Sequence, residues 1–429
     1  MRIAVAQWPL GLRLAFLALL AWIPYLAFLH LPFISDDYGQ IYLSRNYASM
    51  SGWASLAADP LYRCRATSLF FTHWIDLAFG ASPLSHALGG LVLHTLCTWM
   101  VYALGTLSFI GWEMSFIAAC AFAVLEGHQE AVVWIAAQHE PLVFLFAIAA
   151  ILLFYRALVC PAARGLAVAG VVAAYLLTLF SKESGVIVLP ALAALWLWRR
   201  RRPAWLGLLL LILAIFTAWY ILAIFQTSAP HQHLKDGTFE WNSPFISTVT
   251  RSVGRLLWFW GLLAGALVLS AGSREQKITG AVSLGWMALA LLPYSFLAYM
   301  PRVPSRHTYL ASAGLAVLLA AGFGSMRDWA GPQRARWVSA LSLIFLVHNV
   351  AYLYWKKLPQ FEQRAAATEK FLNYARTSKG PLRVSCAPFP LIVYQHVAAV
   401  VLHQPPDSVQ FVAPGGSDSA GAFCDEDLP

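Results

Sequence analysis

Long apolar runs separated by short polar segments dominate the chain. The runs span approximately residues 12–33, 84–106, 111–126, 140–159, 165–181, 184–198, 204–225, 247–270, 278–299, 308–325 and 336–355. Most are close to the roughly 17–25 residues that a helix needs to cross a membrane core of about 30 Å, and the third, fifth and sixth are short. The pattern therefore predicts an all-α polytopic membrane protein with about eleven transmembrane helices.

The composition agrees with this prediction. The 429 residues are 59% hydrophobic and only 11% charged, whereas soluble domains carry about 25% charged residues. The formal net charge of +9 does not indicate a nucleic-acid-binding protein, because the basic residues lie in short loops between apolar runs. The first run is long enough to span and no small-residue cleavage site follows it, so we expect no cleavable signal peptide.

The basic residues also predict the orientation. If the N-terminus is cytoplasmic, the cytoplasmic segments hold Arg2, Arg13, Arg156, Arg164, Arg199 to Arg202, Arg274, Lys277, Arg327, Arg334 and Arg336. An excess of Lys and Arg is the usual mark of cytoplasmic loops. With an odd number of spans, the tail after Trp355 then lies outside.

Two adjacent carboxylates, Asp36 and Asp37, follow the first run directly. An unpaired charge at a membrane boundary is costly, so each carboxylate must be solvated, paired or bound to a cation. Repulsion between the two tends to raise the pKa of one of them. Such a group suits general-base catalysis or metal binding. The alternative is a polar loop in which an Asp caps the next helix.

The predicted outward segments are rich in ionisable residues, whereas the cytoplasmic loops are short and basic. The first, 34–83, is partly apolar and predicts helices that lie along the membrane interface. The others are 126–140, with Glu126, His128 and Glu130; 181–185, with Lys182 and Glu183; 226–246; and 300–309, with Arg302, Arg306 and His307. Ionisable residues that converge on one membrane face from distant segments indicate a functional site.

Each of these groups also has a simpler explanation. The acidic and histidine residues of the second segment could form a polar helix end, and Lys182 could pair with Glu183. Arg302 and Arg306 oppose the usual charge bias. They could bind a phosphate through bidentate hydrogen bonds, or they could anchor lipid head groups. The His-x-His pair that begins at His231 could ligate a metal, although loops often carry histidines without one.

The tail after the last run is less apolar and predicts a small outward-facing α/β unit. Phe361 to Ala375 is expected to form an amphipathic helix, and Leu382 to Ser385 and Leu391 to Tyr394 are expected to form strands. Ala413 to Pro429 is rich in Gly, Ser and Asp, which is typical of a disordered segment. The predicted domains are therefore a transmembrane catalytic domain, 1–355, and a tail, 356–429.

Six cysteines are present, and the predicted topology separates them. Three lie in apolar runs, where cysteine acts as a small hydrophobe, or at the cytoplasmic edge. Cys64, Cys386 and Cys424 lie outside, where oxidation occurs. Because Cys386 and Cys424 share the tail, we expect a disulfide between them. Two free thiols are the alternative.

Five short motifs occur in order along residues 10–355. They are Asp36-Asp37 after the first run; Tyr62-Arg63-Cys64; Leu125 to Val132, with His128, Glu130, Ala131 and Val132; Ser181-Lys182-Glu183-Ser184-Gly185; and Arg306 to Gly314, with Tyr309, Leu310 and Ser312. In this order they resemble the membrane glycosyltransferases of the GT-C class. The likeness is greatest to the membrane half of the transmembrane and tetratricopeptide-repeat O-mannosyltransferases and to their bacterial relatives. The resemblance implies a GT-C-like fold, a polyprenyl-phosphate-linked sugar donor and a location in a bacterial inner membrane, with the active site and the tail periplasmic.

The chain departs from the family pattern at several positions. Cys64 replaces a Pro, Leu125 and Glu126 replace a His-Pro, and Gln138 stands where the family usually has Arg. No tetratricopeptide repeats follow the membrane part. This leaves the acceptor open, because the repeats are a natural place to hold a protein acceptor. Protein, lipid and glycan acceptors are the alternatives.

The resemblance also implies roles for individual residues. Asp36 would be the base that takes the acceptor proton during an inverting transfer, with Asp37 as the alternative base or as its orienting partner. The leaving lipid phosphate would be neutralised by Arg302, Arg306 and Lys182. Sugar or acceptor hydroxyls would be positioned by Arg63, His128, Glu130, Glu183, His307 and Tyr309.

No cofactor is expected, and the alternative is a divalent cation held by Asp36 and Asp37. A transporter or flippase of a lipid-linked sugar is the second class of function that outward charges would suit. Such a protein should have inverted repeats and charged residues at mid-membrane. Here the ionisable residues lie at the ends of the apolar runs. The sequence therefore favours a glycosyltransferase.

Overall fold

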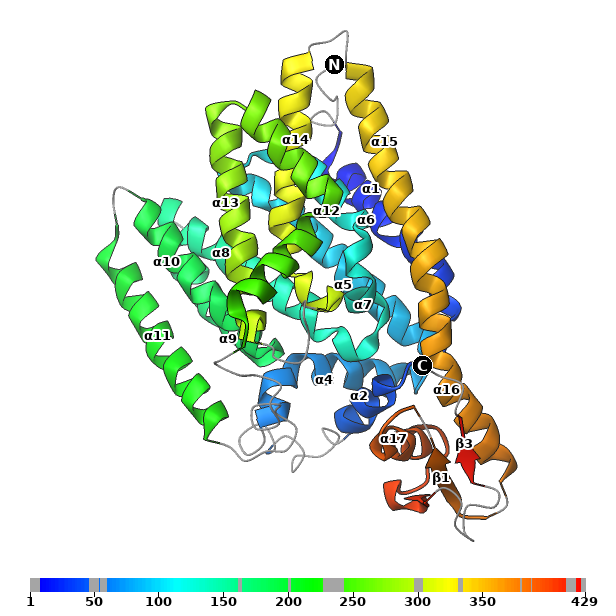
Figure 1. Ribbon diagram of the computed structural model, residues 1–429. Coiled ribbons are helices and arrows are strands. Elements are labelled where there is room, and N and C mark those ends of the chain that lie inside the picture. Colours follow the sequence, from blue (N-terminus) through cyan, green and yellow to red (C-terminus); the bar gives the residue numbers. More distant parts are fainter. Residues whose placement is uncertain are drawn as a thin grey trace.

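The computed structural model describes residues 8–45, 54, 60–160, 164–199, 202–226, 243–296, 304–330, 335–378, 380–386, 388–413 and 422–425. Within these residues the chain is mostly helical (Figure 1). The long helices form a bundle, and a small unit with three short strands lies at one end of it.

The helices of the bundle follow the predicted apolar runs. They are α1 (Leu10–Trp22), which continues as the 3₁₀ helix η2 (Ile23–His30), α5 (Pro83–Ala103), α6 (Trp112–Val124), α8 (His139–Val159), α9 (Arg164–Ser181), α10 (Val188–Trp198), α11 (Ala204–Phe225), α12 (Phe245–Ala271), α13 (Arg274–Leu291), α14 (Ser312–Ala330) and α15 (Ala335–Tyr352). Each predicted run overlaps one of these helices. The predicted all-α polytopic membrane fold is therefore confirmed.

Among the described residues, fewer helices than the predicted eleven have the length and apolarity of a membrane span. By length and apolarity, eight helices in the described part of the chain can cross a membrane. The number is nine if α6 and the segment Glu126–Val133, bent by 58°, count as one span. The two other helices fall short for different reasons. α10 has only 11 residues, and α14 is rich in Ala and Gly and carries Arg327 and Asp328 near its end.

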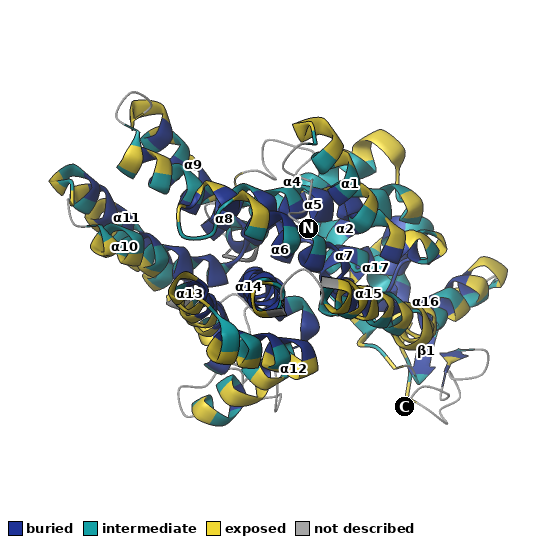
Figure 2. Cartoon of the chain, turned by 90° about the horizontal axis from the view of Figure 1, so that it is seen from above, coloured by how far each residue is buried: buried dark blue, intermediate teal, exposed yellow. Residues whose placement is uncertain are grey.

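Helix α14 lies in the middle of the bundle, and its residues 312–323 are all buried (Figure 2). Two glycines allow this position. A Cβ atom on Gly322 would lie 2.7 Å from the Cα of Ala264 in α12, and one on Gly314 would lie 2.6 Å from the carbonyl oxygen of Ser283 in α13. Small residues let helix backbones approach closely in membrane bundles. α14 therefore packs tightly between its neighbours.

The two ends of the bundle differ. The start of α1, the end of α14 and the start of α15 lie at one end (Figure 1). The opposite end carries α2 (Asp36–Arg45), α4 (Pro60–Phe79), α16 (Leu358–Thr377) and the small unit. α4 lies across this end, roughly perpendicular to the long helices. The first predicted outward segment and the tail thus share one end of the molecule.

The tail is a small parallel sheet packed against helices. Strand β1 (Leu382–Cys386) lies between β2 (Val409–Phe411) and β3 (Phe423–Cys424) and pairs with both in parallel. Phe371 of α16, Tyr394 of α17 (Leu391–Val401) and Phe423 of β3 share one hydrophobic cluster. The same cluster includes Tyr38 of α2. The tail is therefore packed against the helix that begins with the acidic pair.

Two expectations for the tail differ from the structure. Leu391 to Tyr394, predicted as a strand, are the first turn of α17. The two-residue period of a strand and the 3.6-residue period of a helix are hard to separate in a short apolar run. Here the helix continues to Val401. Phe423 and Cys424, predicted as disordered, form β3, where a disulfide joins Cys424 to Cys386 with a Cα–Cα distance of 4.5 Å. The predicted helix and first strand of the tail lie within α16 and β1.

Candidate functional site

The acidic pair lies at the start of α2. Ser35 has a backbone φ of +27°, and the helix begins at Asp36. Asp37 is only 2% exposed, and its two carboxylate oxygens accept hydrogen bonds from the backbone N–H groups of Ile34 (2.9 Å) and Ala136 (3.0 Å). Asp36 is exposed. Asp37 therefore ties α2 to the 3₁₀ turn η6 (Ile135–Ala137), and Asp36 is the carboxylate that a ligand can reach.

Burial and charge act on both carboxylates. Burial raises the pKa of Asp37 to about 7, and its backbone hydrogen bonds oppose this shift. The low-dielectric protein around Asp36 raises the pKa of that residue too, and the positive charge of Arg306 opposes the rise. A carboxylate with a raised pKa is a stronger proton acceptor once ionised. Asp36 thus has the properties of a general base, with Arg306 close enough to act on it.

Arg306 is held by two residues of the second predicted outward segment. Its backbone N–H donates to Glu130 Oε2 (3.1 Å), and its Nη1 lies 3.8 Å from the same oxygen. Its guanidinium carbon lies 5.0 Å from the centre of the Trp134 ring, within the range of a cation–π contact. The Arg306 side chain is 22% exposed. Its charge is therefore fixed in place and still reachable.

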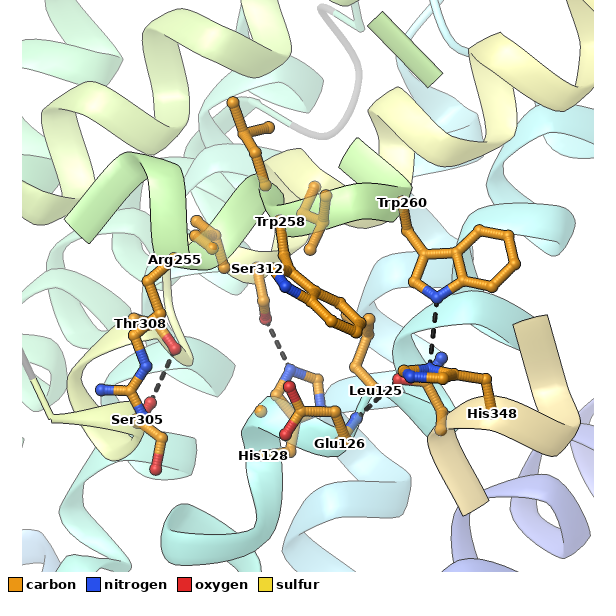
Figure 3. A pocket seen from close by; sticks show the side chains of 15 residues that line it. Leu125, Glu126, His128, Arg255, Trp258, Trp260, Ser305, Thr308, Ser312 and His348 are labelled. Carbon is orange, nitrogen blue, oxygen red and sulfur yellow. Dashed lines mark hydrogen bonds between the residues drawn. The ribbon is translucent and has the colours of Figure 1, made fainter. Parts of the chain in front are cut away.

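A pocket that is partly open to the outside lies beside the turn that contains Arg306. Ser305 and Thr308, in the same 3₁₀ turn as Arg306 (η10, Ser305–Thr308), line it. Figure 3 shows Glu126 in this pocket, with Arg255 on one side and His348 on the other. Trp258 and Trp260 also line it. Indole faces together with a few carboxylate and hydroxyl groups suit a sugar ring or another polar small molecule.

Trp258 interrupts α12 at this pocket. Its φ of 37° and ψ of −147° are not helical, and a non-glycine residue in this region is strained. The side chain is exposed although it is a large indole. Such strain persists only where the surrounding structure imposes it, and it clusters at functional sites. The kink in α12 is thus a second sign that this pocket has a function.

Lys182 and His307 lie in a separate, buried cluster. Lys182 forms an ion pair with Glu140 of α8, which is fully buried. His307 Nδ1 lies 2.6 Å from Glu140 Oε1, and its ring stacks on Tyr294 with a centroid distance of 4.5 Å. Burial lowers the pKa of His307 to about 4, which keeps the ring neutral at pH 7. The cluster joins distant segments of the bundle and has the character of a structural element.

Glu183 pairs with Arg65 of α4, at 2.8 Å, and not with Lys182. The simpler pairing considered for Lys182 is therefore replaced by two separate ion pairs, one buried and one nearer the surface. Arg63 lies on α4 two residues before Arg65 and is partly buried.

His128 and Tyr309 are buried. The Tyr309 hydroxyl lies 2.8 Å from His94 Nδ1, and His128 Nε2 lies 2.7 Å from Ser312 Oγ. These contacts hold the start of α14 against α5 and the turn η5 (Glu126–His128). His128 also lines the pocket. Both residues therefore support the site from within.

Three of the candidate ligand-binding residues, Arg302, His231 and His233, lie outside the residues that the structure describes. Among the described residues, no group of three or more His, Cys, Asp or Glu side chains could hold a metal ion. A cation at the acidic pair would depend mainly on Asp36, because both oxygens of Asp37 already accept backbone hydrogen bonds.

Sequence reasoning assigned no role to Glu140, Trp134 or Arg364. Glu140 carried a signal, since an ionisable residue at the start of an apolar run needs a partner. Arg364 belongs to α16, and its Nη1 lies 3.6 Å from Glu130 Oε1. No local pattern could reveal this contact, because it depends on how the tail helix packs against the bundle.

The fold resembles that of ArnT from Cupriavidus metallidurans, solved bound to undecaprenyl phosphate. The TM-score is 0.55 at 12% identity, and the match covers 95% of this chain and 86% of ArnT. The oligosaccharyltransferase AglB of Archaeoglobus fulgidus, solved with an inhibitory peptide and a dolichol-phosphate, matches at a TM-score of 0.48 and 14% identity. That match covers 94% of this chain and 64% of AglB, so the chain spans less than two thirds of that protein.

No protein-family model and no curated protein sequence matches the chain. At 12% identity the likeness to ArnT is a likeness of fold alone, and it agrees with the GT-C-like fold that the motifs imply. The particular likeness to O-mannosyltransferases is not specifically supported.

Proposed function

We propose that this protein is a membrane glycosyltransferase that moves a sugar from a polyprenyl-phosphate-linked donor to an acceptor hydroxyl. One observation carries the proposal: the exposed carboxylate of Asp36 lies within the influence of Arg306 at one end of a GT-C-like bundle. Transfer from a phosphate leaving group needs a base for the acceptor and a fixed cation for the phosphate. The likeness in fold to a protein solved with undecaprenyl phosphate supports a lipid carrier.

In the proposed reaction, the acceptor O–H gives its proton to the Asp36 carboxylate while its oxygen bonds to the anomeric carbon. The bond from that carbon to the phosphate oxygen breaks on the opposite face, so the configuration inverts. The electron pair leaves with the polyprenyl phosphate, and Arg306 stabilises the negative charge. Asp37 is a positioning residue, because it holds the start of α2 against η6.

The finer features of the proposal follow from the sequence and the pocket. The basic loops favour a periplasmic site in a bacterial inner membrane, with the N-terminus cytoplasmic. The pocket that contains Glu126 and Trp258 would receive the sugar ring. The motif resemblance favours a mannosyl donor. The acceptor would be a hydroxyl of a protein, a lipid or a glycan, and the reaction is proposed to need no cofactor.

The test is transfer by the purified protein in lipid nanodiscs. Radiolabelled polyprenyl-phosphate mannose, with the glucosyl analogue for comparison, is incubated with candidate acceptors in the presence and absence of a chelator. We expect label to move from the lipid to an acceptor, with inverted anomeric configuration and no effect of the chelator. Movement of the intact donor across vesicle membranes without any transfer would support a flippase and contradict the proposal.

A further inference from the structure

Positive charge exceeds negative charge around Arg306. Lys357 of the π-helical turn η12 (Leu353–Lys357) and Arg255 of α12 act on the carboxylate of Glu126. The charges of Glu130 and Arg364 also act on Lys357. The cluster thus has four cations, Arg255, Arg306, Lys357 and Arg364, beside three carboxylates, those of Asp36, Glu126 and Glu130. Partly buried charges need partners, so a surplus of this kind calls for an anion.

Two of these arginines share one carboxylate and one indole. Arg306 Nη1 lies 3.8 Å from Glu130 Oε2, and Arg364 Nη1 lies 3.6 Å from Glu130 Oε1. The two guanidinium carbons lie 5.0 and 5.9 Å from the centre of the Trp134 ring. Side chains from η10 and α16, far apart in the sequence, therefore converge on one spot.

Glu130 positions the two guanidinium groups without using their donors. Separations of 3.6 and 3.8 Å are too long for hydrogen bonds. Each guanidinium carries five N–H donors in a planar fork that matches phosphate oxygens. The Arg306 and Arg364 side chains are 22% and 47% exposed, and Glu130 is 13% exposed. The carboxylate is thus covered, and the arginines are the groups that a ligand would meet.

Packing of α16 fixes Arg364 in this place. Its helix neighbours Phe361 and Ala365 are buried, and the Phe361 ring packs edge-on against Phe28 with a centroid distance of 5.9 Å. Thr368 Oγ1, further along the helix, donates to the carbonyl oxygen of Phe33 (3.4 Å). α16 therefore docks on the residues that lead to the acidic pair, at the end of the bundle where α2 lies (Figure 1).

We infer that Arg306 and Arg364 form a clamp for the phosphate group of the polyprenyl-phosphate donor, so that the tail helix α16 is part of the donor site. The inference rests on the proposed function for the identity of the anion. The phosphate lies between the two guanidinium forks, with Glu130 and Trp134 holding both. The same chemistry fits the head group of a bulk anionic phospholipid, and the test separates the two sources.

The test measures binding of polyprenyl phosphate, and of the polyprenol of equal length, to the full-length protein in phosphatidylcholine nanodiscs. Arg364→Gln should weaken binding of the phosphate about ten-fold, the lower end of the range for a charge-assisted hydrogen bond because Arg364 is half-exposed. Arg364→Lys should restore part of it, since Lys keeps the charge and lacks the planar fork. Arg376→Gln is the matched control, an exposed arginine about 18 Å further along the same helix. It should bind as the wild type does.

Two further arms decide the source of the phosphate and the link to transfer. The effect of Arg364→Gln should persist when phosphatidylglycerol is added to the nanodiscs. Retention of phosphatidylglycerol that depends on Arg364, with unchanged binding of polyprenyl phosphate, would assign the site to bulk lipid and overturn the inference. Equal binding of the polyprenol and of polyprenyl phosphate would also overturn the inference, because the phosphate group would then contribute nothing to binding. If the wild type binds polyprenyl phosphate through Arg364 but transfers no sugar, the clamp stands and the proposed function fails. If Arg364→Gln transfers sugar normally with unchanged binding, the proposed function stands and the clamp fails.

Discussion

Asp36 and Asp37 are neighbours in the chain, yet their surroundings differ. The oxygens of Asp37 accept backbone hydrogen bonds from Ile34 and Ala136, so this buried carboxylate is part of the scaffold. Asp36 is exposed, and the charge of Arg306 acts on it. In the proposed reaction Asp36 is therefore the base, and Asp37 holds the start of α2 in place.

The pH dependence of transfer should report this arrangement. The base works only when ionised, so kcat should fall as the pH drops through the pKa of Asp36. Because that pKa is raised above its ordinary value, the acidic limb should lie above about pH 3.9. Arg306 lowers the pKa of Asp36, so Arg306→Gln should move the limb to higher pH. The measurement is kcat at saturating donor across the pH range.

Arg306→Lys is the control for this shift, because it keeps the positive charge. The acidic limb of the kcat profile of Arg306→Lys should stay near that of the wild type even if its turnover is lower. A limb that stays in place, or moves to lower pH, in Arg306→Gln would show that Arg306 does not act on the base.

Only part of the site could be predicted from residue types. Asp36, Arg306 and Glu130 were expected in the site, and the structure brings them together. Lys182 and Tyr309 were expected to touch ligands, and both are buried among protein groups. A motif gives the residue type and its order, but the direction of a side chain follows from packing. The contact of Arg364 with Glu130 needs the whole tail helix in place.

At the scale of elements, the buried cluster around Glu140 joins α8, the turn after α9 and η10. A buried ion pair contributes little net stability, but breaking it leaves a charge without a partner. Nothing in the cluster is placed to meet a lipid phosphate. Lys182 is therefore a structural residue in this account.

Lys182→Met should lower the free energy of unfolding by about 3–5 kcal/mol, because it leaves the Glu140 carboxylate buried without its cation, with only His307 and the Tyr294 hydroxyl in hydrogen-bonding contact. The double variant Lys182→Met with Glu140→Gln should recover most of that loss. Thermal unfolding in detergent measures both. A Lys182→Met protein that folds normally and has a raised KM for the donor would contradict the structural role and indicate that Lys182 binds the donor phosphate.

The tail depends on a covalent link between two of its strands. The disulfide between Cys386 and Cys424 closes a loop of 38 residues and holds β3 beside β1. Cys424→Ser should cost the tail about 2–4 kcal/mol of stability and expose its end to proteases. Peptide mapping without reductant checks the link in protein from intact membranes. Alkylation of both thiols before any reduction would contradict it.

The type of each element could be predicted from the sequence where the apolar run was long. Every long run became a helix, because a membrane leaves the backbone few other ways to satisfy its hydrogen bonds. The short apolar run that begins at Leu391 was predicted to be a strand and is a helix. The kink at Trp258 had no sequence signal, since neither Pro nor Gly stands at that position.

For the whole molecule, the predicted sidedness agrees with the arrangement of the bundle. The start of α1, the end of α14 and the start of α15 lie at one end, and α2, α16 and the small unit of the tail lie at the other. If the N-terminus is cytoplasmic, the acidic pair and the tail lie on the opposite, outer side of the membrane. A reporter that is active only outside the cytoplasm, fused after Pro429, should therefore be active. A fusion that is expressed but inactive would show that the tail lies in the cytoplasm and that the predicted orientation is wrong.

The central claim is that Asp36 is the base of a sugar transfer. The most direct measurement is the rate of transfer from a labelled polyprenyl-phosphate sugar by Asp36→Asn, since the amide keeps the shape but cannot accept the proton. If Asp36 is the base, the rate should fall by about 10²–10⁴, with an unchanged unfolding temperature and unchanged binding of polyprenyl phosphate. Turnover of Asp36→Asn close to that of the wild type would show that Asp36 is not the base.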